Sequence, residues 1–250
     1  MTSSTPPTPS AEGAPAEKPV SRWEDLVDIF VSPAELFERR KNSSPWFPLI
    51  VAAVVSFALF LATRPLLQPI YDVMGDKMMA AAQQAGRQVT PEQMERGRTI
   101  GTWIAAASQL VVIPITIAIT GFVLWIVGKL VDARESLGAA IMVCAFAFFP
   151  RLLSWVALGI EGVLMDISHA TLISIGFSAA RFAGTGTSPV VLALLSRVDL
   201  FIIWTTILLA IGLSITGRIS RGRAAIAAIV VWLLGAIPPM FTALSGRSPM

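Results

Sequence analysis

The sequence contains little charge, one cysteine and one histidine, and each of these shortages excludes a class of protein. Charged residues make up 14% of the 250 residues, whereas soluble globular domains carry about 25%. Hydrophobic residues make up 54% and the mean hydropathy is +0.70, which indicates a chain that faces lipid instead of water. Because Cys144 and His169 each stand alone, an intrachain disulfide and a metal site built from several cysteines or histidines are excluded.

Catalytic and cofactor motifs are missing as well. The chain has no G-x-S-x-G, H-E-x-x-H or G-x-x-x-x-G-K-[ST] pattern. We therefore expect a protein that is not an enzyme, with no catalytic residue, no metal site and no cofactor. The net charge of +3 does not indicate nucleic-acid binding, because the basic residues flank apolar runs, as juxtamembrane anchors do. We interpret His169, beside Ser168 at the end of an apolar run, as an interfacial residue.

Long uncharged runs are the main positive feature of the chain. The clearest lie at 200–217 and 224–246, on either side of the basic segment RISRGR. At a rise of about 1.5 Å per residue they cover about 27 and 34 Å, enough to cross a hydrocarbon core of about 30 Å. The short basic linker favours an antiparallel helical hairpin whose arginines lie in the cytoplasm. Overall, we predict an all-α polytopic integral membrane protein with five transmembrane helices, at about 46–67, 99–128, 137–160, 199–217 and 224–244.

The amino-terminal part divides into two segments ahead of a five-helix domain at 45–246. Residues 1–20 predict a disordered tail, since prolines and small polar residues bury too little apolar surface to fold. Residues 21–44 predict an amphipathic juxtamembrane segment in the headgroup layer, with a helix start and capping box at residues 32–35. Packing beneath the bundle and docking of a soluble partner are alternatives. The predicted interfacial or partner-binding residues are Trp23, Phe30, Phe37, Arg39, Arg40 and Lys41.

Two segments between the spans are less regular. Residues 68–98 predict an external helical excursion, with a second helix start at 90–93. Residues 162–197 are apolar but interrupted by glycine and proline, which indicates interfacial or re-entrant helices. Ser188 and Pro189 predict the start of one of these helices.

Ionisable residues inside the spans are the candidate site. Arg151 and Asp199 lie at compatible depths, so we predict an intramembrane ion pair that fixes the packing of the third and fourth spans, with Arg197 or Glu161 nearby. A substrate or proton pathway that also uses Gln109 is the alternative. Small residues such as Gly212 predict close helix packing within the chain, and self-association is left open.

Four stretches resemble a known family. Residues 30–37 read FVSPAELF and residues 45–50 read PWFPLI, while residues 198–204 read VDLFIIW and 149–151 read FPR. In these features the chain is similar to the bacterial branch of the Yip membrane-domain family, over about residues 23–243. The resemblance implies five transmembrane helices with a cytoplasmic amino terminus. For bacterial members it implies no assigned activity.

The eukaryotic relatives bind Rab-type GTPases, but this chain departs from them. It lacks their Asp-Leu-Tyr-Gly-Pro and Gly-Tyr motifs, and Tyr71 is its one tyrosine. Rab-type GTPase binding is therefore not carried over. We expect a scaffold or membrane-organising protein of the bacterial inner membrane, with its carboxyl terminus outside. Its partners would be the lipid bilayer, other membrane proteins or a second copy. The alternative is a transporter or channel component that uses Arg151 and Asp199.

Overall fold

The computed structural model describes residues 21–84, 86, 90–167, 174–184 and 186–245. Within these ranges the protein is helical, and the one β-type feature is an isolated bridge between Ser178 and Asp199. This confirms the all-α fold class. The predicted tail at 1–20 and His169 lie outside the described residues.

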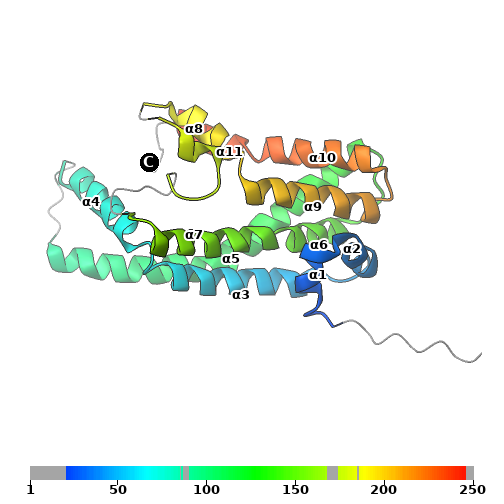
Figure 1. The fold of residues 1–250 in the computed structure, drawn as a ribbon, viewed down its shortest axis with the longest axis horizontal. Coiled ribbons are helices and arrows are strands. Elements are labelled where there is room, and N and C mark those ends of the chain that lie inside the picture. The colour runs from blue at the N-terminus through cyan, green and yellow to red at the C-terminus, as the bar shows by residue number, and fades with distance from the viewer. Residues whose placement is uncertain (1–20, 85, 87–89, 168–173, 185, 246–250) are drawn as a thin grey trace, which may run out of the picture.

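Long apolar helices lie side by side and form the body of the molecule (Figure 1). They are α3 (Trp46–Thr63), α5 (Pro91–Leu130), α6 (Leu137–Ala147) with α7 (Phe149–Leu164), α9 (Leu200–Thr216) and α10 (Arg221–Leu234). Two of the predicted spans are broken in the structure. The third span divides at Phe148 into α6 and α7, where Pro150 occupies the first turn of α7. The last divides after α10, and α11 (Ile237–Leu244) follows.

Among the described residues, four stretches are long and apolar enough to cross a membrane, namely Trp46–Thr63, Glu92–Leu130, Leu137–Leu164 and Arg221–Leu244. The fifth predicted span, α9, is an apolar helix of 17 residues. Its length of about 26 Å is slightly less than a hydrocarbon core of about 30 Å. The multi-helix membrane fold is thus confirmed, while the number of five spans stays a prediction.

Helix α5 is longer than any bilayer needs. Its 40 residues extend about 60 Å, so its first part projects beyond the other spans (Figure 1). There it is joined to α4 (Gln68–Gln84) by an ion pair of 2.9 Å between Asp72 and Arg98. The predicted helix start is confirmed, because Thr90 and Gln93 form a reciprocal capping box.

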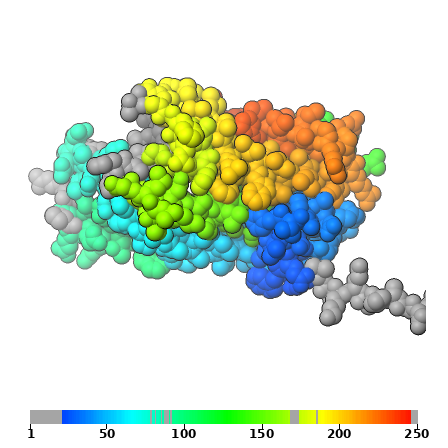
Figure 2. All heavy atoms as spheres, viewed as in Figure 1, coloured from blue at the N-terminus to red at the C-terminus, as the bar shows by residue number. Residues whose placement is uncertain are grey.

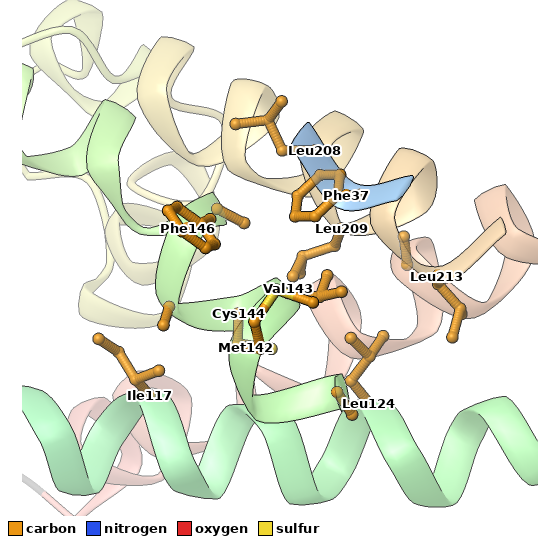
Figure 3. Packing of buried hydrophobic residues seen from close by; sticks show 14 of the residues in the cluster. Phe37, Ile117, Leu124, Met142, Val143, Cys144, Phe146, Leu208, Leu209 and Leu213 are labelled. Carbon is orange, nitrogen blue, oxygen red and sulfur yellow. The ribbon is translucent and has the colours of Figure 1, made fainter. Parts of the chain in front are cut away.

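Helix α6 occupies the centre of the bundle. From Ala139 to Ala147 all of its residues except Ile141 are buried. Figure 3 shows its residues between Ile117 and Leu124 of α5 on one side and the leucines of α9 on the other. Close approach of α5 requires a glycine, since a Cβ atom at Gly121 would lie 2.7 Å from the Ile141 Cα.

A second group of short elements lies at the end of the bundle away from the amino terminus. It contains η1 (Ala179–Phe182) and α8 (Pro189–Leu195), and α8 packs against α11 (Figure 1). The predicted start of α8 is confirmed, since the Ser188 hydroxyl accepts a hydrogen bond from the Val191 amide. A small apolar cluster of Leu67, Ile70, Ile167 and Ile175 is separate from the main core of the bundle.

Candidate functional site

The juxtamembrane segment folds into a helical hairpin of α1 (Asp25–Val31) and α2 (Pro33–Arg40). The Asp25 carboxylate is 1% exposed and accepts from Arg39 Nη2 at 2.7 Å and from Arg40 Nε at 2.8 Å. Asp28 pairs with Arg39 as well. The role of these two aspartates was not expected, although their place one helix before the arginines is a usable signal. Pro33 begins α2 as predicted, but the capping box is wrong, because no side chain caps that helix.

Phe37 does not form part of an outer surface. It is fully buried, as is Leu36, and it lies between α6 and α9 (Figure 3). Phe30 is half-buried and meets Trp204 edge-to-face, with ring centroids 5.6 Å apart. The prediction of Phe37 as an interfacial residue is wrong, because α2 packs against α9, where Gly212 leaves room for the Phe37 ring. Figure 2 shows the hairpin, in blue, lying against the gold surface of α9.

The opposite side of α1 carries an exposed apolar stripe. Trp23, Val27 and Val31 are 66%, 61% and 70% exposed, and their spacing of four places them on one face. Trp23 also meets Phe47 of α3 edge-to-face. The basic residues of the hairpin are engaged by acidic neighbours, since Lys41 pairs with Glu38. The apolar part of the exposed surface of the hairpin is therefore the stripe of Trp23, Val27 and Val31, whereas its arginines are paired with acidic side chains.

The predicted ion pair between Arg151 and Asp199 does not form. Asp199 instead caps α9, where its Oδ1 accepts from the amides of Phe201 at 2.9 Å and Ile202 at 3.0 Å. The carboxylate acts on Arg151 and Arg197 through space, without a hydrogen bond to either. Glu161 is also occupied, since it pairs with Arg181 at 3.1 Å.

A cavity of about 460 Å³ lies between α5, α9 and α10 at this level. Arg151 and Arg197 line it together with four threonines, Thr116, Thr120, Thr205 and Thr206. Arg197 is held in place by Trp232, whose carbonyl accepts from Arg197 Nη2 at 3.0 Å and whose Nε1 donates to the Arg197 carbonyl at 3.2 Å. Gln109 takes no part, because it lies outside the cavity lining and its amide donates to the Ala105 carbonyl within α5.

A buried carboxylate lies at the other end of the bundle and was not expected from the sequence. Glu135 is 3% exposed, and neither of its carboxylate oxygens has a hydrogen-bond partner among the described residues. Gly128 and Gly217 make room for it, since Cβ atoms there would lie 2.3 and 2.9 Å from its two oxygens. Burial raises the pKa of Glu135, an effect that Lys129 partly offsets.

The described residues contain no group of three or more His, Cys, Asp or Glu side chains that could hold a metal ion.

Comparison with known proteins matches the Yip1 domain to residues 27–241. The chain belongs to the Yip1 domain family. A curated relative, "Membrane protein YknW" of Bacillus subtilis (strain 168), is 25% identical over 234 residues, which cover 93% of each chain. No solved structure matches. This confirms the resemblance to the bacterial Yip family and identifies the protein as a bacterial membrane protein.

The Yip1 domain match covers the cavity and most of the hairpin. It begins at Val27, within the exposed stripe of α1, and ends at Phe241, beyond the cavity between α5, α9 and α10. Trp23 and Asp25 precede the match.

Proposed function

We propose that this Yip-family protein is a non-enzymatic, membrane-organising scaffold of the bacterial inner membrane. The observation that carries the proposal is the α1–α2 hairpin, which is fastened to the bundle on one side and presents Trp23, Val27 and Val31 on the other. In this arrangement the hairpin keeps these three exposed apolar side chains at a fixed position beside the transmembrane helices.

The direction of the hairpin supports insertion into one leaflet. Figure 1 shows α2 nearly end-on, crossing the direction of α3 and α9. The exposed stripe of α1 lies near exposed apolar residues at the start of α3, Trp46 and Ile50, and Trp23 contacts Phe47. Apolar side chains of an interfacial helix gain free energy when they enter the boundary between headgroups and acyl chains.

Basic residues at the same end support a cytoplasmic location for the hairpin. The turn between α9 and α10 lies at this end of the molecule (Figure 1) and carries Arg218, and the first turn of α10 adds Arg221 and Arg223. Arg134 lies beside this turn, since its amide donates to the Gly217 carbonyl. By the positive-inside rule, this end faces the cytoplasm, and the carboxyl terminus lies outside if five helices span the membrane.

The packing around α6 favours a scaffold over a transporter or channel. Toward the hairpin end, the turns that follow the arginine-lined cavity carry Leu124, Leu213 and Ala227, all fully buried in the apolar core. A transport pathway needs polar groups or water along its whole length. Because apolar side chains fill this half of the bundle, the packing supports a scaffold and not a transport pathway.

Spin labelling tests the position of the hairpin. Val27→Cys and Val31→Cys, each labelled with a nitroxide in phospholipid nanodiscs, should be accessible to oxygen and shielded from a water-soluble nickel chelate. Glu35→Cys on the exposed side of α2 is the matched control and should show the reverse. The natural Cys144 is buried in α6, and unmodified protein provides the labelling background. Equal nickel accessibility at positions 27 and 35 contradicts the proposal.

A further inference from the structure

The cavity between α5, α9 and α10 contains polar groups that nothing in the described protein satisfies. We propose that it binds a phosphate-type oxyanion, presented either by an anionic phospholipid headgroup or as free phosphate. This site lies at the end of α9 opposite to Phe37 and is independent of the hairpin and its proposed role.

Unpaired donors converge on this space. The Arg197 Nε and the Thr205 hydroxyl are buried without a hydrogen-bond partner among the described residues. The Arg151 guanidinium forms neither a salt bridge nor a hydrogen bond with any described residue, and its Cζ lies 5.8 Å from the centroid of the Phe148 ring. Polar groups without hydrogen-bond partners are unfavourable at membrane depth, so a ligand that accepts several hydrogen bonds would stabilise this arrangement.

The charge of the site favours an anion. Two guanidinium groups line the cavity, and among the described residues Asp199 is the carboxylate that acts on both. Its Oδ1 is already used by the two amides at the start of α9, so it does not neutralise the arginines by direct contact. Guanidinium groups bind phosphate in a forked geometry, which suits Arg151, whose donors are unoccupied by the described residues.

The rim of the cavity indicates how a lipid would reach it. Ile119 of α5 and Leu234 of α10 line the cavity and are 59% and 40% exposed, so the opening lies beside apolar, lipid-facing surface. Arg197 precedes α9, which places the polar end of the cavity near the boundary of the hydrocarbon region. A volume of about 460 Å³ is within the range of about 300–1,000 Å³ found for small-ligand sites.

Native mass spectrometry of the full-length protein in detergent can measure binding of each source. Phosphatidylglycerol is titrated against phosphatidylcholine with the same acyl chains, and inorganic phosphate is titrated separately by calorimetry. We expect Arg151→Gln to weaken binding of the oxyanion about tenfold, because the forked contact is lost. Arg96→Gln, the same change at an exposed position of α5, is the matched control and should leave binding unchanged.

Two milder variants distinguish a loss of binding from a folding defect. Thr205→Val keeps the shape of the side chain and removes the unpartnered hydroxyl, and Arg151→Lys keeps the charge but removes the fork. Each should weaken binding about threefold while circular dichroism and thermal unfolding stay as in the unmodified protein.

The outcomes separate the two sources. Arg151-dependent preference for phosphatidylglycerol identifies a lipid headgroup, whereas Arg151-dependent binding of inorganic phosphate without lipid preference identifies the free ion. If neither ligand binds, or if the Arg151 and Thr205 variants bind both as the unmodified protein does, the proposal is overturned. Failure here leaves the spin-label result on the hairpin untouched, so the two proposals are tested separately.

Discussion

Phe37 of α2 lies directly against Gly212 of α9. A Cβ atom at position 212 would come 3.2 Å from Phe37 Cε2, and 2.4 Å from Val143 Cγ1 of α6. The glycine thus creates the space in which the hairpin is fastened to the bundle. An aromatic ring and a glycine that are 175 positions apart in the chain hold α2 and α9 together.

Replacement of Gly212 by alanine should destabilise the protein by about 1–3 kcal/mol, because the added methyl group overpacks the contact of three helices. Chemical unfolding in mixed micelles measures this difference. Gly222→Ala is the control, since a Cβ atom there meets nothing within 4 Å. Because the added methyl group should push α2 away from α9, we also expect trypsin to cleave the bond after Arg39 more readily in the Gly212 variant. Equal stability of both variants would show that the contact has room to adjust.

Loss of the Asp25 carboxylate should weaken the packing of α1 against α2. Asp25→Asn removes a buried partner of two arginines, and breaking a buried ion pair costs about 3–5 kcal/mol. The Arg39 side chain is partly exposed, so we expect the lower end of that range. Hydrogen exchange of the amides of α1 is the local readout. Glu38→Gln removes an exposed pair instead and should change stability by less than about 1 kcal/mol.

Glu135 makes stability depend on pH. Burial raises its pKa in the folded protein above the ordinary value of 4.5, so folding favours the protonated form. The resulting stabilisation is complete below pH 4.5 and is lost as the pH rises through the folded pKa. Glu135→Gln should therefore be more stable than the unmodified protein at pH 8, by about 1–2 kcal/mol.

The difference between the two proteins should shrink as the pH falls toward 4.5, the ordinary pKa of a glutamate side chain. Unfolding curves between these limits provide the measurement, and Glu38→Gln, at an exposed position, should show no such convergence. A glutamine variant that is less stable at pH 8 would contradict this prediction, because it would mean that the ionised Glu135 carboxylate has a hydrogen-bond partner in the folded protein.

Exchange of the charges at positions 151 and 199 should not restore stability. Asp199→Arg removes the cap of α9, which costs about 1 kcal/mol, and Arg151→Asp does not replace that cap. We therefore expect the double variant to be at least as unstable as Asp199→Arg alone. Thermal unfolding in phospholipid nanodiscs compares the four proteins. Recovery in the double variant would instead indicate a direct ion pair.

Helix positions were largely predictable from the sequence, because they depend on nearby residues and on length. Uncharged runs of about 20 residues must satisfy their main-chain groups internally in lipid, so they form helices wherever they occur. Thr90 and Ser188 begin helices as predicted because a cap is made with amides three residues away. The same local reasoning was wrong at Ser32, where the hairpin turn takes the serine away from capping geometry.

The partners of individual side chains depended on the tertiary structure. An amphipathic pattern in residues 21–41 shows that one face is apolar, but packing against α9 decided that Phe37 is inside while Val27 and Val31 are outside. Arg151 and Asp199 were predicted to pair because they lie at similar depths in the membrane. In the structure the Asp199 carboxylate instead accepts hydrogen bonds from amides of α9, and the Arg151 guanidinium lines a cavity. The burial of Glu135 also depends on contacts among α5, the loop before α6 and the end of α9.

By itself, then, the sequence determined a helical membrane protein of the Yip1 domain family and the approximate limits of its helices, because apolar length and capping are local properties. Only the tertiary structure decided which face of the hairpin is free, which carboxylate caps a helix and which donors remain unpaired. Each of these depends on segments that are distant in the chain and meet only after the helices have packed.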